Sequence, residues 1–162
     1  MAEPLKFLYN QTFVKGLSNV LKKHYPALNE KAFSSSVFDK NWDEKELKQR
    51  MRHIANVLHA FLPQDFKKAS SILVKVIAEI GNDEKLGMNF GYMLFPDFIE
   101  QFGIDDYDTS IKAFEEITKV TSAEFGVRPF LIKYPSKMQK QMLVWSKHKH
   151  PMVRRLSSEG FR

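Results

Sequence analysis

The last stretch of the chain carries charged side chains at a spacing that could bind phosphate. In the segment HPMVRRLSSEGFR, helical spacing places the apolar Val153, Leu156 and Gly160 on one side and a polar ridge on another. Guanidinium groups form paired hydrogen bonds with phosphate oxygens. A carboxylate among them is unfavourable for binding a polyanion, so a glutamate kept there is a candidate for a chemical role. The ridge consists of Arg155, Ser158, Glu159 and Arg162.

A second candidate carboxylate, Glu124, lies in the stretch TSAEFGVRPFLIKY. Pro129 falls inside the apolar helical pattern of this stretch, where it removes one backbone hydrogen bond and kinks or ends a helix. Glu124 stands four residues before Arg128, and Arg155 stands four residues before Glu159. Each couple could form an exposed ion pair worth roughly 0.3 kcal/mol. The spacing therefore leaves two interpretations open, namely solvated surface pairs or side chains of a site.

Helices must position these side chains, because helical periodicity dominates the chain and no short stretch alternates as a strand would. A turn-rich passage with Gly87 and Gly91 interrupts the pattern near the middle. The expected helix starts, given by caps or by a proline in the first turn, are Asn29, Asp43, Asp108 or Thr109, Ser122, Pro135 and Pro151.

The pattern predicts an all-α chain of about eight helices of one to five turns, joined by short loops. Consecutive short helices pack as antiparallel pairs, and a run of such pairs stacks into a solenoid. From about Thr109 onward the helices recur every 15–20 residues or so, which is compatible with two-helix units of roughly 40 residues. No sequence repeat is visible, so periodicity alone leaves a compact bundle open as the alternative.

The composition of the chain favours a soluble domain and argues against a membrane span, a secretory signal and a metal site. The chain has 162 residues, 43% hydrophobic and 27% charged, which fits one soluble domain. No apolar run approaches the roughly 18 residues of a membrane span, and the first residues lack the pattern of a secretory signal. Cysteine is absent, and the five histidines have no convincing partner at metal-ligand spacing. We therefore expect a cytoplasmic protein with no cofactor, no metal and no membrane contact.

The positive charge of the chain is concentrated in its last quarter. The formal net charge is +6, and residues 126–162 contain nine lysines and arginines against one acid, Glu159. The first 125 residues are close to neutral. A basic block of this kind favours a polyanionic partner, most often nucleic acid, although a solvated lysine-rich face is the alternative.

Two runs in this basic part, EFGVRPFLIKYP and LVWSKHKHPMVRRLSSEGFR, resemble the bacterial alkylpurine DNA glycosylases of the AlkC type. These proteins are relatives of AlkD built from HEAT-like helical repeats. Their pattern is approximately S/T-x-E-F-x-V-R-P-F, followed further along by V-R-R-L-x-S-E-G-x-R-P-R-L-P-W. The resemblance covers residues 121–162, whereas the first 120 residues fit by helical character alone. The matched positions are Glu124, Phe125, Val127, Arg128, Pro129, Phe130, Val153, Arg154, Arg155, Leu156, Ser158, Glu159, Gly160 and Arg162.

The resemblance implies a fold of HEAT-like antiparallel helical repeats that form a curved solenoid with a basic concave face. Residues 1–162 are then expected to be a single all-α domain and the N-terminal part of a longer protein, with residues 121–162 bearing the motifs. The family pattern continues beyond the last arginine into P-R-L-P-W, so its aromatic residue would lie after Arg162. The family often has a histidine where this chain has Met152, and Trp145 is expected in the core.

The implied activity is hydrolysis of the N-glycosidic bond of cationic N-alkylated purines, such as N3-methyladenine, in double-stranded DNA. A cationic base leaves as a neutral one, so the enzyme needs negative charge near the developing oxocarbenium sugar and a positioned water. The implied catalytic acids are Glu124 and Glu159. The implied DNA-binding residues are Arg128, Arg154, Arg155, Arg162 and Ser158.

Two other classes stay open on the sequence. A non-catalytic HEAT-like module that binds nucleic acid or protein would tie Glu124 to Arg128 and Glu159 to Arg155 in pairs four residues apart. A helix-turn-helix regulator would place the last helix in a DNA groove, as the turn KHKHP and the arginines after it permit. A glycosylase instead requires both glutamates to face one concave basic surface.

Overall fold

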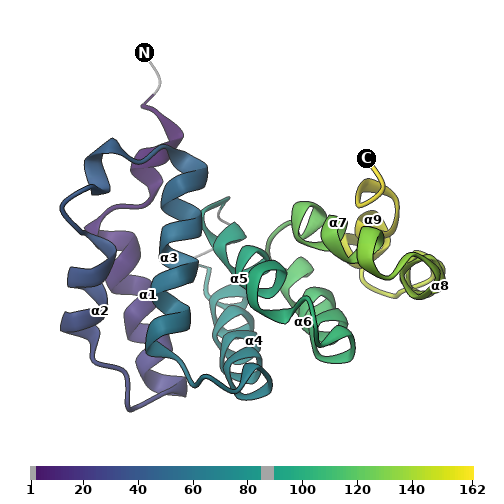
Figure 1. Ribbon diagram of the computed structural model, residues 1–162, viewed down its shortest axis with the longest axis horizontal. Coiled ribbons are helices and arrows are strands. Elements are labelled where there is room, and N and C mark those ends of the chain that lie inside the picture. Colours follow the sequence, from purple (N-terminus) through teal and green to yellow (C-terminus); the bar gives the residue numbers. More distant parts are fainter. Residues whose placement is uncertain (1–2, 85–89) are drawn as a thin grey trace.

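The computed structural model describes residues 3–84 and 90–162, and within them every regular element is helical. Figure 1 shows the helices following one another across the long axis of the molecule, from the purple N-terminal end to the yellow C-terminal end. The all-α prediction is therefore confirmed. The helices are α1 (Gln11–His24), α2 (Glu30–Val37), α3 (Leu47–Phe61), α4 (Phe66–Asn82), α5 (Leu94–Gly103), α6 (Tyr107–Thr118), α7 (Glu124–Lys133), α8 (Pro135–Ser146) and α9 (Pro151–Glu159). Short 3-10 turns accompany them in the described residues, namely η1 (Leu5–Leu8), η2 (Trp42–Glu44) and η3 (Phe90–Met93).

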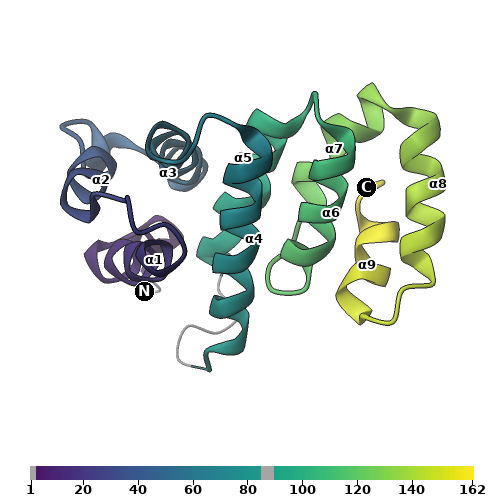
Figure 2. The same ribbon diagram turned by 90° about the horizontal axis from the view of Figure 1, so that it is seen from below.

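The helices stack in two rows. One row runs α1, α4, α6 and α9, and the other runs α3, α5 and α7, with α8 beside α7 and α9. Figure 2 shows α4 to α9 standing side by side, with α8 and α9 antiparallel at the yellow end. Stacking of this kind, in which each helix contacts the next one and the one in the neighbouring pair, is compatible with a solenoid.

Local side-chain chemistry sets several of the helix starts. Asn29 accepts a hydrogen bond from the backbone N–H of Ala32, and so caps α2 as the sequence predicts. Pro135 and Pro151 occupy the first positions of α8 and α9, where a missing N–H costs nothing. These three predicted starts are confirmed.

The start expected at Asp43 is wrong. Residues 42–44 form η2, and α3 begins at Leu47 after Glu46, whose backbone N–H donates to the Gln49 side chain at 2.8 Å. The reason is tertiary, because Trp42 is buried beneath the guanidinium of Arg50, which lies 4.7 Å from the ring centroid. A continuous helix from Asp43 would carry this indole away from its place in the core.

Three smaller boundaries also differ from the sequence expectations. Helix α6 begins at Tyr107, because the Asp106 side chain accepts from the Thr109 N–H and acts as the cap earlier than expected. Ser122 accepts from the Glu124 N–H at 3.4 Å, but Ala123 occupies the cap position of α7. Glycine followed by asparagine favours the end of a helix, and Gly81-Asn82 predicts such an end, but α4 continues through Asn82 and so includes Gly81.

The two glycines expected in the central turn have different outcomes. Gly91 lies in η3, and Gly87 lies outside the described residues.

One hydrophobic cluster extends from Tyr9 to Leu156 and so joins both ends of the molecule. Trp145 is fully buried in it, which confirms the expectation that this tryptophan is core. Its indole N–H donates to the Glu115 carboxylate of α6 at 2.8 Å. This bond satisfies a polar group that would otherwise be buried without a partner, and it fixes α8 against α6.

Candidate nucleic-acid interface

The start of α7 is fixed closely against α5. A Cβ added at Gly126 would lie 2.9 Å from the Pro96 carbonyl oxygen and 2.9 Å from Cε1 of Phe114. Only a glycine therefore lets the first turn of α7 approach the α5 backbone at this distance. Pro129 sits inside the helix and offers no N–H, yet α7 continues to Lys133. Glu124, the first residue of α7, is placed by this packing.

Helix α9 is fixed in a similar way at its other end. Val153 and Leu156 are buried, as their spacing predicts. A Cβ at Gly160 would lie 3.0 Å from Cε of Met142 in α8 and 3.0 Å from Cγ2 of Val127 in α7. The end of α9 thus packs where α7 and α8 meet, and this brings its polar ridge toward the start of α7.

The two motif segments meet in an ion pair between Glu124 and Arg155. Oε1 of Glu124 lies 3.5 Å from Nη2 of Arg155, and the two side chains are 22% and 58% exposed, respectively. The carboxylate is therefore mostly shielded, while the guanidinium remains largely open to solvent. Such a pair contributes little to stability, and it leaves most of the arginine open to a second anion.

Glu159, the last residue of α9, pairs with Arg162, just beyond the end of the helix. Oε2 of Glu159 lies 3.3 Å from Nη1 of Arg162, and the carboxylate side chain is 26% exposed. The pairs four residues apart that the spacing allowed, Glu124 with Arg128 and Glu159 with Arg155, do not form among the described side chains. The arrangement expected of two ordinary surface pairs is therefore not the one observed.

Arg154 and Ser158 have partners inside the chain. Nη1 of Arg154 donates to the carbonyl oxygens of His148 and Lys149 at 2.7 and 2.9 Å, which closes the turn between α8 and α9. The Ser158 hydroxyl donates to the Arg155 carbonyl at 3.0 Å. Of the predicted DNA-binding residues, Arg154 thus has a clear structural role in the loop.

A groove of about 350 Å³ lies between α3, α5 and α7, and Phe125, the residue after Glu124, lines it. Phe125 contributes a ring that is half exposed, and two cations lie over it. The Arg128 guanidinium is 4.5 Å from the ring centroid, and Nζ of Lys48, from α3, is 5.5 Å from it. Lys48 was not among the sequence candidates, because only the packing of α3 beside α7 brings it here.

A third cation in the groove, Arg52, is already neutralised. Nη2 of Arg52 donates to Asp97 at 2.7 Å and to Glu100 at 3.3 Å, and the Asp97 side chain is only 3% exposed. The hydrogen bond to Asp97 raises the pKa of Arg52. Burial, with the nearby Asp97 charge, raises the pKa of Glu100 above its usual range. This cluster stabilises the floor of the groove.

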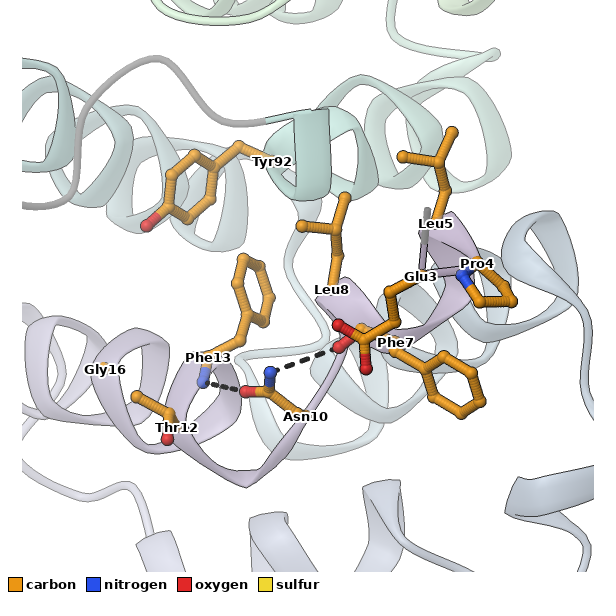
Figure 3. A pocket seen from close by; sticks show the side chains of 10 residues that line it. All are labelled: Glu3, Pro4, Leu5, Phe7, Leu8, Asn10, Thr12, Phe13, Gly16 and Tyr92. Carbon is orange, nitrogen blue, oxygen red and sulfur yellow. Dashed lines mark hydrogen bonds between the residues drawn. The ribbon is translucent and has the colours of Figure 1, made fainter. Parts of the chain in front are cut away.

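A separate depression of about 520 Å³ opens near the N-terminal end (Figure 3). Asn10 lines it, and its side chain accepts from the Phe13 N–H and donates to the Phe7 carbonyl. Glu3 is the one residue with a charged side chain among its described lining residues. The depression reflects the cap of α1 and carries no group of candidate residues.

Two features are absent from the described residues, namely a membrane-spanning helix and a metal-binding cluster. In residues 3–84 and 90–162, no helix is long and apolar enough to cross a membrane. The same residues contain no group of three or more histidine, aspartate or glutamate side chains arranged to hold a metal ion.

Comparisons with known proteins give a relative and a solved structure. No family model matches the chain. The sequence is 37% identical over 158 residues to an uncharacterized protein of Bacillus subtilis (strain 168), YhaZ. This match covers 98% of the chain and 42% of YhaZ, so the chain spans less than half the length of this relative.

The fold matches part of a solved DNA glycosylase structure. The structure is Pseudomonas fluorescens alkylpurine DNA glycosylase AlkC bound to DNA containing an abasic site analog. The TM-score is 0.89 at 28% sequence identity, and the match covers all of this chain and 43% of that one. The chain therefore shares the all-helical AlkC fold, as the sequence resemblance implied.

Proposed function

We propose that the chain is part of a DNA alkylation repair enzyme that hydrolyses the N-glycosidic bond of cationic N-alkylated purines such as N3-methyladenine. We further propose that it forms one HEAT-like domain of a longer protein. The observation that carries the proposal is the contact between Glu124 of α7 and Arg155 of α9, which joins the two motif segments at one place. The likeness to AlkC, whose structure holds DNA, supports the same function.

In the proposed chemistry the enzyme does not have to protonate the leaving base. When the C1′–N bond breaks, the electron pair goes to the cationic base, which departs neutral without being protonated. The sugar becomes oxocarbenium-like, and the carboxylate of Glu124 stabilises this positive charge. Water then adds to C1′ and gives its proton to a carboxylate, either Glu124 or Glu159. Arg155 positions Glu124, since it lies beside that side chain.

The exposed cations around the carboxylates would hold the DNA. Arg155 and Arg162 are 58% and 79% exposed, so each can contact a phosphate while it stays beside its glutamate. Arg128 lines the groove between α3, α5 and α7. Arg154 would act indirectly, by keeping the turn before α9 in place.

Base release from methylated duplex DNA tests this function. In the full-length protein, Glu124→Gln removes the negative charge with almost no change in shape, and we expect the rate to fall on the order of 100-fold or more. Glu159→Gln is expected to lower the rate as well. The matched control is Glu30→Gln in the first turn of α2, a helix that packs against α1 and α3, and it should leave the rate unchanged.

Each outcome of this assay has a distinct meaning. A full-length protein that binds methylated DNA but releases no base would overturn the glycosylase proposal in favour of a non-catalytic binding module. Unchanged release by Glu124→Gln, with active wild type, would remove this residue from the proposed chemistry.

A further inference from the structure

We infer that Lys48 and Arg128, gathered around Phe125, form a phosphate site for a DNA strand in the groove between α3 and α7. The inference rests on the proposed function, and it extends the DNA path from the α7–α9 end of the molecule to the first helical unit. Without Lys48, the candidate DNA contacts would be confined to α7 and α9.

The two cations come from helices far apart in the sequence but share one ring. Lys48 lies in the first turn of α3, and Arg128 lies in the second turn of α7. Their charged groups lie 5.5 and 4.5 Å from the Phe125 centroid, respectively. A cation over an aromatic face is attracted to it. The ring therefore holds two positive charges close together, despite their repulsion, at the surface of the groove.

Among the three cations of the groove, Lys48 and Arg128 are available to bind a ligand, whereas Arg52 is not. Arg52 is neutralised by Asp97 and Glu100, whereas Lys48 and Arg128 have no ion pair or side-chain hydrogen bond among the described residues. Nε of Arg128 is buried and has no partner. An anion would therefore bind at the remaining N–H groups of Arg128, through charge-assisted hydrogen bonds.

The position of the pair indicates which anion fits. Phe125 directly follows Glu124 in the first turn of α7, with Glu124 paired to Arg155 of α9 and Phe125 in contact with Lys48 of α3, so a strand that crosses this turn passes both side chains. The remaining walls of the groove include Met51, Met93 and Ile132, which are apolar and suit the faces of deoxyribose. The apolar walls can contact the sugars of a DNA strand, and the paired cations can contact its phosphates.

The salt dependence of duplex binding measures the site directly. For a duplex, the slope of log affinity against log salt becomes shallower by about 0.9 for each phosphate that the protein no longer neutralises. We expect Lys48→Gln to reduce the slope by this amount, and Lys48→Arg to retain it. Phe125→Leu keeps the charge but releases both cations, so it should weaken binding on the order of threefold at fixed salt. Lys31→Gln, an exposed position on α2, is the matched control and should change neither quantity.

Arg155→Gln, measured in parallel, separates this inference from the proposed function. If the protein binds no duplex at all, the proposed function fails first. If Arg155→Gln weakens binding but Lys48→Gln changes neither slope nor affinity, the groove site is wrong and the proposed function stands. Equal slopes for Lys48→Gln and Lys31→Gln would also overturn the groove site.

Discussion

At the scale of single residues, the two adjacent arginines of α9 have different roles. Consecutive residues of a helix point about 100° apart. Arg154 consequently turns back to the carbonyls of His148 and Lys149, while Arg155 reaches across to Glu124. The family resemblance implies DNA binding for both, but Arg154 holds the turn and Arg155 faces the candidate site.

This difference predicts opposite effects of replacing the two arginines. Arg154→Ala should lower the free energy of unfolding by about 1 kcal/mol, because it removes charge-assisted hydrogen bonds to two carbonyls. Arg155→Ala should cost less than about 0.5 kcal/mol, since an exposed ion pair is worth little, yet it should reduce base release more. Urea unfolding of the two variants checks the order, and an Arg155→Ala variant less stable than Arg154→Ala would contradict it.

At the scale of helices, the placement of Glu124 depends on how closely α7 lies against α5. Gly126 allows this approach, and one of the two atoms nearest to it is a backbone carbonyl oxygen rather than part of a flexible side chain. Backbone cannot move aside cheaply, so a methyl group there has to displace α7 itself.

Gly126→Ala is therefore expected to destabilise the chain by about 1–3 kcal/mol through overpacking, and to lower base release even where the protein stays folded. The control is Gly16→Ala in α1, which adds the same methyl group beside the open depression of Figure 3. Since alanine favours a helix over glycine, Gly16→Ala should not destabilise. Thermal unfolding with parallel activity measurements distinguishes the two, and equal effects would refute the role of Gly126.

The start of a helix was predictable from the sequence where a cap or a proline in the first turn determines it. The cap at Asn29 and the prolines at Pro135 and Pro151 act through neighbouring backbone atoms, and each predicted start is confirmed. The start at Asp43 failed because burial of Trp42 decides that segment.

In the candidate site, likewise, the motif residues could be predicted from the sequence, but the contacts between helices could not. The motif identified Glu124 and Arg155 as candidates, but spacing alone offered each a partner in its own helix. Their contact depends on α9 packing against α7, and the arrival of Lys48 depends on α3 packing beside α7. Neither packing has a signature within a short stretch of sequence.

At the scale of the whole molecule, the described helices share one hydrophobic cluster rather than two. Stacked helical proteins can unfold in parts, because each unit contacts only its neighbours. Here the cluster is continuous from Tyr9 to Leu156, and the two rows contact each other through α4, α5, α6 and α7.

We therefore expect a single cooperative thermal transition, with equal calorimetric and van't Hoff enthalpies. Arg154→Ala, although it lies at one end, should shift this whole transition to lower temperature rather than split it. Two resolved transitions in the calorimeter would show instead that the ends unfold separately.

The positions of the two tryptophans have an optical consequence. Trp42 lies beneath a guanidinium in the first helical unit, and Trp145 is buried in α8 with its N–H on Glu115. Each end of the molecule thus carries its own intrinsic fluorophore in a different electrostatic environment. Within residues 1–162, replacing Trp42 with phenylalanine leaves tryptophan emission from the α8 end alone, so changes around α9 on adding DNA become visible without a dye near the groove.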